Sequence, residues 1–183
     1  MKTILIAGLG NPGKEYAKTR HNAGFMFVDY FWEVNRENFS EWEYSRKLKA
    51  EICSGKFEGK KIILLKPRTF MNLSGEAIAA AVKYFIRGET SNSLVVVHDE
   101  IDLPLGTFRF SSDSSSAGHK GAQNIIDRLG TKYFTRVRIG IGNKEDKQIP
   151  TEKYVLGKFA NSEIKLLKEI LKKSSTELLK RIL

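Results

Sequence analysis

Cysteine, proline and long apolar runs are scarce in this chain. Its 183 residues include one cysteine, Cys53, and four prolines. A lone cysteine excludes an internal disulfide framework and favours a reducing compartment. No apolar stretch approaches the length of a membrane span, and glycine, asparagine and proline interrupt the first apolar run before it reaches signal-peptide length. We therefore expect a cytoplasmic protein that makes no membrane contact.

Acidic residues are also in short supply. The chain has 31 Lys and Arg against 21 Asp and Glu, a formal net charge of +10 at pH 7. An excess of positive charge raises the local concentration of polyanions, of which nucleic acid is the commonest in a cell. The same excess also suits an ordinary solvated surface, so charge alone leaves both interpretations open.

Apolar runs typical of strands alternate with segments of helical periodicity. We expect strands at 3–8, 47–54, 61–66, 94–98, 106–112 and 134–142, and helices at 22–37, 74–88, 120–129 and 162–182, the last of them amphipathic. This alternation predicts an α/β fold: a single domain over residues 1–183 with a central twisted, mixed, largely parallel sheet flanked by helices. Functional loops in such a sheet follow the carboxyl ends of the strands.

Residues 8–13 spell Gly-Leu-Gly-Asn-Pro-Gly, a literal G-x-G-x-x-G after a predicted strand. A dinucleotide site would need backbone N–H groups and a helix N-terminus directed at the pyrophosphate. Pro12 removes one of those donors, and residues 14–21 lack the apolar periodicity of a packed helix. The expected acid about twenty residues further on is missing, because Asp29 falls inside a predicted helix. We therefore expect no nucleotide cofactor.

Three longer motifs carry more information. They are residues 8–24 (GLGNPGKEYAKTRHNAG), 66–75 (KPRTFMNLSG) and 97–106 (VHDEIDLPLG), followed by shorter motifs at 118–121 (GHKG), 138–142 (RIGIG) and 154–159 (YVLGKF). In this order and spacing they resemble the motifs of the bacterial-type peptidyl-tRNA hydrolase family. The resemblance implies an enzyme that hydrolyses the ester bond between peptide and tRNA in peptidyl-tRNA released from ribosomes, which recycles the tRNA. It also implies a monomer that binds the acceptor stem and 3′ end of its substrate and uses no cofactor.

Ester hydrolysis needs an activated water and a donor for the developing oxyanion. A neutral histidine is a suitable base near pH 7, and a carboxylate on its other ring nitrogen fixes the tautomer. By resemblance, His21 is the general base and Asp99 orients it. Taken without the motifs, His21 would suit a surface or helix-capping position, and Asp99 a solvated acidic turn.

Two asparagines and three larger side chains complete the expected site. By resemblance, Asn11 reads the first peptide group of the substrate, and Asn72 helps to hold the water or the reacting carbonyl. Tyr16, Phe70 and Met71 resemble positions that line the site around the tRNA 3′ end and the peptide. Each asparagine could instead stabilise its own loop through an Asx turn, and the other three could be ordinary loop packing.

The chain departs from the family in the residues expected to bind tRNA. Lys120 occupies the position of an asparagine that contacts the tRNA end and helps to position water, and a lysine can only donate. Arg109 keeps one basic position of the clamp for the 5′-phosphate, whereas Ser111 replaces a lysine. Arg136 and Arg138 are candidates to compensate, although one of the two could simply solvate the strand edge.

His98 and His119, with Asp99 and Asp102, raise the possibility of a metal site. Neither an HExxH motif nor a cysteine pair accompanies them, and the reaction of the family uses no metal, so we expect none. A second alternative is an RNA-binding protein without catalysis, which the lysine at position 120 favours.

Overall fold

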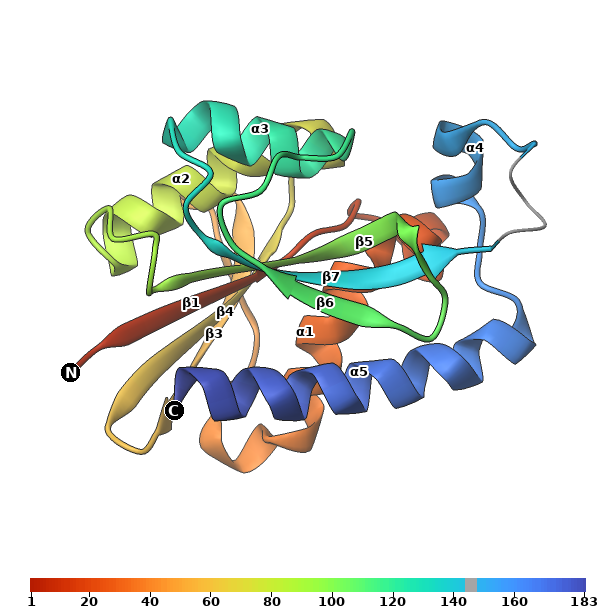
Figure 1. Cartoon of the computed structure of the whole chain (residues 1–183). Coiled ribbons are helices and arrows are strands. Elements are labelled where there is room, and N and C mark those ends of the chain that lie inside the picture. Colours follow the sequence, from red (N-terminus) through yellow and green to blue (C-terminus); the bar gives the residue numbers. More distant parts are fainter. Residues whose placement is uncertain (144–147) are drawn as a thin grey trace.

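One seven-stranded sheet forms the centre of the molecule (Figure 1). The computed structural model describes residues 1–143 and 148–183. Across the sheet the order is β2-β3-β4-β1-β5-β7-β6. The four parallel strands in its middle are β4 (Lys60–Pro67), β1 (Thr3–Gly8), β5 (Leu94–Pro104) and β7 (Thr135–Gly142). The antiparallel strands at its edges are β2 (Glu43–Ser45), β3 (Ala50–Phe57) and β6 (Phe108–Ser111).

Helices cover both faces of the sheet. Figure 1 shows α1 (Ala23–Val34) and α5 (Asn161–Ile182) on one face, and α2 (Ser74–Phe85) and α3 (Lys120–Leu129) on the other. Each pair encloses its own apolar core against the sheet. The short α4 (Thr151–Leu156) lies beyond the end of β7. Within the described residues, none of the helices has the length and apolar character needed to cross a membrane.

The predicted α/β class and the mixed, centrally parallel sheet are confirmed. Helix α3 begins and ends where the pattern predicted, and the Glu58-Gly59 turn joins β3 to β4 with both residues in the left-handed region. The prediction for β5 was too short, because the strand continues to Pro104 alongside β7 after an irregularity beyond Glu100. Strand β2 and helix α4 were missed, since segments of three and six residues are too short to show a periodicity.

Close packing explains the glycines of the first motif. A Cβ on Gly8 would lie 2.2 Å from the Gly24 carbonyl oxygen, and one on Gly10 would lie 2.6 Å from the Phe25 ring. These glycines therefore let the start of α1 pack directly on the end of β1. Because α1 begins only at Ala23, no α-helix N-terminus follows Gly13, which further disfavours a dinucleotide site.

Candidate active site

Three loops converge at the carboxyl ends of the parallel strands. They follow β1 and β4 and precede α3, and they bring residues from distant parts of the chain around Asp99 in β5. The loop after β1 contains two short 3-10 turns, η1 (Lys14–Tyr16) and η2 (Arg20–Asn22), and η4 (Met71–Leu73) follows β4. This is the edge at which an α/β sheet of this type binds its ligands.

Asp99 and His21 form the buried centre of the site. The His21 Nδ1 atom lies 2.9 and 3.0 Å from the two carboxylate oxygens of Asp99. Burial alone would raise the pKa of the Asp99 carboxyl, but attraction to His119 and His21 and their hydrogen bonds outweigh it and hold that pKa far below its usual range. Asp99 is therefore ionised, and His21 donates its Nδ1–H to it. The Nε2 atom of His21 keeps its lone pair and has no partner among the described residues.

A second histidine, His119, bonds to the same carboxylate. Its Nε2 atom lies 2.9 Å from Asp99 Oδ1, while its Nδ1 atom accepts a hydrogen bond from the backbone N–H of Ala122 at 3.2 Å. Since Nδ1 accepts, the ring proton must be on Nε2, and this proton is donated to Asp99. Sequence reasoning considered His119 only as a metal ligand and missed this role. Its place just before α3, as an N-cap, was the available signal.

His98 lies beside the His119 ring, tilted against it by 58°, and does not bond to the carboxylate of Asp99. Its Nδ1–H donates to the backbone carbonyl of Asp99 at 2.7 Å, and its ring centroid lies 4.5 Å from that of His119. Burial, followed by the nearby His119, lowers the pKa of His98 to about 3. The ring is therefore neutral, and its buried Nε2 has no partner among the described residues. His98 therefore contacts the backbone of Asp99 and the ring of His119 without bonding to the carboxylate.

The nitrogen and oxygen atoms of His21, Asp99 and His119 lie within 4.8 Å of one another, close enough to suggest a metal site. The hydrogen bonds account for the cluster in another way. In the tautomers that these hydrogen bonds assign, both ring nitrogens that face Asp99 carry protons, so in this arrangement neither offers a lone pair to a cation. Of the four residues that the sequence suggested as ligands, Asp99 and His119 belong to this cluster. Asp102 is exposed, and the His98 Nδ1 atom donates to the backbone carbonyl of Asp99.

Asn11 is buried and held in one orientation. Its Oδ1 accepts the backbone N–H of Met71 at 2.8 Å, and Asn22 clamps its backbone through two bonds of 2.9 and 3.0 Å. Because Oδ1 is occupied on the protein side, the Nδ2 amide remains as the donor that a substrate can meet. The predicted alternative, an Asx turn, does not describe these contacts.

The other residues expected around the substrate lie on the η4 side of the site. Asn72 and Phe70 are exposed, and Asn72 makes no side-chain hydrogen bond to a described residue. Tyr16 meets Phe70 edge to face, with ring centroids 6.3 Å apart. Met71 is buried and contributes its backbone to Asn11. The structure thus brings these residues to one side of the site.

The basic residues differ sharply in exposure. Lys120, on the first turn of α3, is exposed and forms an ion pair with the equally exposed Glu152 of α4. Arg109 is exposed on β6 and has no ion pair among the described residues. Arg138 makes two bonds to Glu100, of 2.9 and 2.7 Å. Arg136 is only 1% exposed, so in this conformation its side chain does not reach the surface of the protein.

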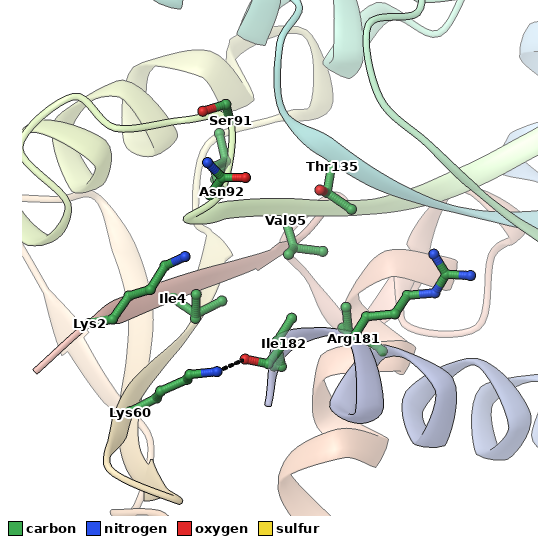
Figure 2. Close-up of a pocket in the computed structure, with 11 residues that line it drawn as sticks. Lys2, Ile4, Lys60, Ser91, Asn92, Val95, Thr135, Arg181 and Ile182 are labelled. Carbon is green, nitrogen blue, oxygen red and sulfur yellow. Dashed lines mark hydrogen bonds between the residues drawn. The ribbon is translucent and has the colours of Figure 1, made fainter.

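A cavity of about 270 Å³ lies at the opposite end of the strands (Figure 2). It is lined by the first residues of β1, β5 and β7 and by three cations, Lys2, Lys60 and Arg181. The Lys60 ammonium already donates to the carbonyls of Ile182 and Leu183, and Arg181 pairs with Glu177 and stacks on Phe110. Figure 2 shows the Arg181 guanidinium turned away from the two lysines. The lining contains no histidine, cysteine or carboxylate side chain that could act as a base or nucleophile. The site around Asp99 is therefore the better candidate for the active site.

Comparison with known proteins agrees with this geometry. The family model for peptidyl-tRNA hydrolase matches residues 5–183. A peptidyl-tRNA hydrolase of Bartonella bacilliformis is 45% identical over 168 residues, which are 92% of this chain and 83% of that protein. One from Thermodesulfovibrio yellowstonii is 43% identical over 168 residues, 87% of this chain and 82% of that protein. The crystal structure of the Acinetobacter baumannii enzyme superimposes with a TM-score of 0.86 at 32% identity, covering 98% of this chain and 88% of that one.

With these comparisons, the fold and the histidine–carboxylate site define an α/β enzyme of the hydrolase class. The resemblance inferred from the motifs is confirmed. The chain belongs to the peptidyl-tRNA hydrolase family.

Proposed function

We propose that this enzyme hydrolyses the ester bond between the peptide and the tRNA in peptidyl-tRNA released from ribosomes, with His21 as the general base. One observation carries the proposal: Asp99 holds His21 through Nδ1 and leaves Nε2 without a partner among the described residues. A neutral imidazole with one free nitrogen can accept a proton from water near pH 7. The whole chain, residues 1–183, acts as one domain in this proposal.

The reaction follows from this arrangement. The His21 Nε2 atom takes a proton from a water molecule as its oxygen attacks the ester carbonyl. Asp99 stabilises the imidazolium that forms. When the tetrahedral intermediate collapses, the ribose oxygen leaves and receives the proton from Nε2. The products are a tRNA with a free 3′-terminal hydroxyl and a peptide carboxylic acid, which releases its proton to the solvent and becomes a carboxylate. His21 is then neutral again.

The two asparagines supply recognition and support. The Asn11 Nδ2 amide donates to the first peptide carbonyl of the substrate, a group that aminoacyl-tRNA with its free amine lacks. Asn72, which is exposed and makes no side-chain hydrogen bond to a described residue, holds the water or donates to the reacting carbonyl. The buried bonds to Met71 and Asn22 keep Asn11 fixed before substrate arrives.

The tRNA end binds on the exposed side of the same site. Tyr16 and Phe70, whose rings meet edge to face, offer an aromatic edge for the unpaired bases of the 3′ end, because bases stack on aromatic rings. Met71 is buried beside Asn11 and lines the site from the protein side. Lys120 and Arg109 supply positive charge for the phosphates of the acceptor stem. We propose that the enzyme does this as a cytoplasmic monomer, without a metal or another cofactor.

The proposal is tested with N-acetyl-aminoacyl-tRNA as substrate. We expect His21→Ala to lower kcat by ~10²–10⁴, the usual contribution of a general base, and to change tRNA binding little. Binding of uncharged tRNA by the same variant is the control that separates catalysis from recognition. Activity within a few-fold of the parent enzyme would remove His21 from the mechanism.

Two further measurements separate the alternatives. An RNA-binding protein without catalysis would bind the tRNA but release no N-acetyl-amino acid. A metal-dependent enzyme would lose activity after exhaustive chelation and regain it with zinc or magnesium, whereas we expect full activity in excess chelator.

A further inference from the structure

Arg136 is a charged side chain in a position that its present contacts do not explain. It is 1% exposed, and its guanidinium makes one hydrogen bond, from Nη1 to the backbone carbonyl of Ser115 at 2.8 Å. Its Nε and Nη2 atoms are buried and have no partner among the described residues. Burial, and then the neighbouring Arg138, lower the pKa of Arg136, with Glu100 opposing them. A buried, incompletely paired cation is costly, which argues that its single bond has a role.

That bond holds the backbone in the middle of the loop that joins β6 to α3, whose other attachments run through Asp113, Ser114 and Ser116. Residues 112–118 join β6 to α3 and contain two non-glycine residues in the left-handed region, Asp113 (φ 51°) and Ala117 (φ 49°). Such conformations are unfavourable and need support from their surroundings. The side chain of Ser115 is exposed, so its carbonyl is the part of the residue that the protein holds.

The next residue connects this attachment to the catalytic centre. The carbonyl of Ser116 accepts the backbone N–H of His119 at 3.0 Å, and the Ser116 hydroxyl donates to Gln123 of α3 at 2.8 Å. His119 in turn donates to Asp99, the carboxylate that orients His21. A continuous path of direct contacts therefore runs from Arg136 through Ser115 and Ser116 to His119.

We propose that Arg136 is a positioning residue for hydrolysis: by holding the Ser115 carbonyl, it keeps His119 on Asp99. It contributes no tRNA contact, which replaces the expectation from the sequence that it binds tRNA. The inference rests on the proposed roles of His21 and Asp99, and it extends them to a residue on another strand. Arg138 does not share the role, because both of its bonds go to Glu100.

The test compares Arg136→Met with Arg109→Met and Lys132→Met. Arg109 lies on the same face of the sheet but is exposed, and Lys132 pairs with Asp113 on the outer side of the same loop. We expect Arg136→Met to lower the single-turnover rate at saturation about tenfold, with KM and the salt dependence of tRNA binding unchanged. Arg109→Met should leave the single-turnover rate unchanged, raise KM and make the salt dependence of tRNA binding shallower. A lost phosphate contact reduces the salt slope by about one unit. Lys132→Met should leave the rate unchanged.

A double-mutant cycle identifies the path. If Arg136 acts through His119, Arg136→Met should have no further effect on the rate in a His119→Ala background. Arg136→Lys keeps the charge and can donate to the Ser115 carbonyl, so it should retain part of the rate. This variant tests the proposal if Arg136→Met fails to fold. The proposal is overturned by a parental rate in either folded variant, by additive effects in the cycle, or by a reduced salt slope. If His21→Ala stays active, the proposed mechanism fails; if His21→Ala is inactive and Arg136→Met is not impaired, only this inference fails.

Discussion

The two sides of the active site are built differently. On the side formed by the loops after β1 and β4, Asn11 and His21 are buried and fixed by short hydrogen bonds to other protein groups. On the side formed by α3 and α4, Lys120 and Glu152 are mostly exposed and, within the part of the chain that the structure describes, pair with each other. The first side matches the family motifs and the second departs from them. The difference suggests that chemistry depends on a preorganised set of contacts, whereas recognition of a flexible polyanion tolerates exchange of exposed charges.

The largest effect expected on the preorganised side is that of Asp99→Asn. An amide is neutral and has only one oxygen to accept the hydrogen bonds of His21 and His119. Its NH2 group can also donate to His21 Nδ1, which favours the wrong tautomer of that ring. We expect kcat to fall by about 10²–10⁴ with KM nearly unchanged. Single-turnover hydrolysis at saturating enzyme measures this. If only KM rose and kcat stayed the same, Asp99 would serve substrate binding. The buried side would then not be the side on which the chemistry depends.

The second effect is on stability and concerns His98, the buried ring behind the site. Its pKa is about 3 in the folded protein and about 6.5 in the unfolded chain. Between these values the unfolded chain binds more protons, so stability falls as pH drops below about 6.5, by up to about 1.4 kcal/mol per pH unit. The loss ends once the pH falls below the folded-state value.

His98→Asn tests this because an asparagine keeps a donor near the position of Nδ1 but does not titrate. Urea unfolding at several pH values between about 6.5 and 4.5 should give a flatter dependence for the variant. His21 and His119 are the same in both proteins, so the difference between the two pH curves reports on His98 and its interaction with His119. Parallel pH curves for the two proteins would mean that His98 is not kept neutral by the fold.

The sequence predicted the sheet better than it predicted the surroundings of the carboxylate. The alternation of apolar runs was enough for the parallel strands, since their burial on both faces leaves a clear pattern. The motifs located His21, Asp99, Asn11 and Asn72, but the role of His119 depends on which atoms bond to each ring nitrogen. The N-cap contact to Ala122 is local, but the contact to Asp99 joins residues 20 positions apart, and no local pattern encodes it. The burial of Arg136 was missed for a similar reason. The alternation along β7 cannot show that the loop before α3 covers this position.

A third and smaller effect concerns substrate choice by Asn11. The variant Asn11→Ala removes the Nδ2 donor and should narrow the ratio of kcat/KM between N-acetyl-aminoacyl-tRNA and aminoacyl-tRNA about tenfold, the value of one lost hydrogen bond in a buried site. Asn11→Asp is the matched variant, since it keeps the oxygen that accepts from Met71 and lacks the donor. It should lose discrimination as well. If either variant keeps the parental ratio, another group reads the peptide bond.

The smallest effect is expected at Lys120, on the exposed side. As a phosphate contact, Lys120 must leave Glu152 before it can bind tRNA, so the carboxylate competes with the substrate in the free enzyme. Exposed ion pairs contribute little, and we expect only about a two- to fourfold change in KM. Lys120→Asn should raise KM and make the salt slope shallower by about one unit. Glu152→Gln should lower KM, and both variants should keep kcat.

The alternative is that Lys120 helps to position the attacking water, the role that the resemblance implies for the asparagine of the family at this position. In that case Lys120→Asn changes kcat and leaves the salt slope as it was. Measuring kcat and KM over ~50–200 mM salt separates the two roles. The pair adds a second criterion, because competition by Glu152 requires that Glu152→Gln has no effect once Lys120 is asparagine. Should Glu152→Gln still lower KM in that background, the carboxylate repels tRNA by itself, and the ion pair across α3 and α4 has no part in recognition.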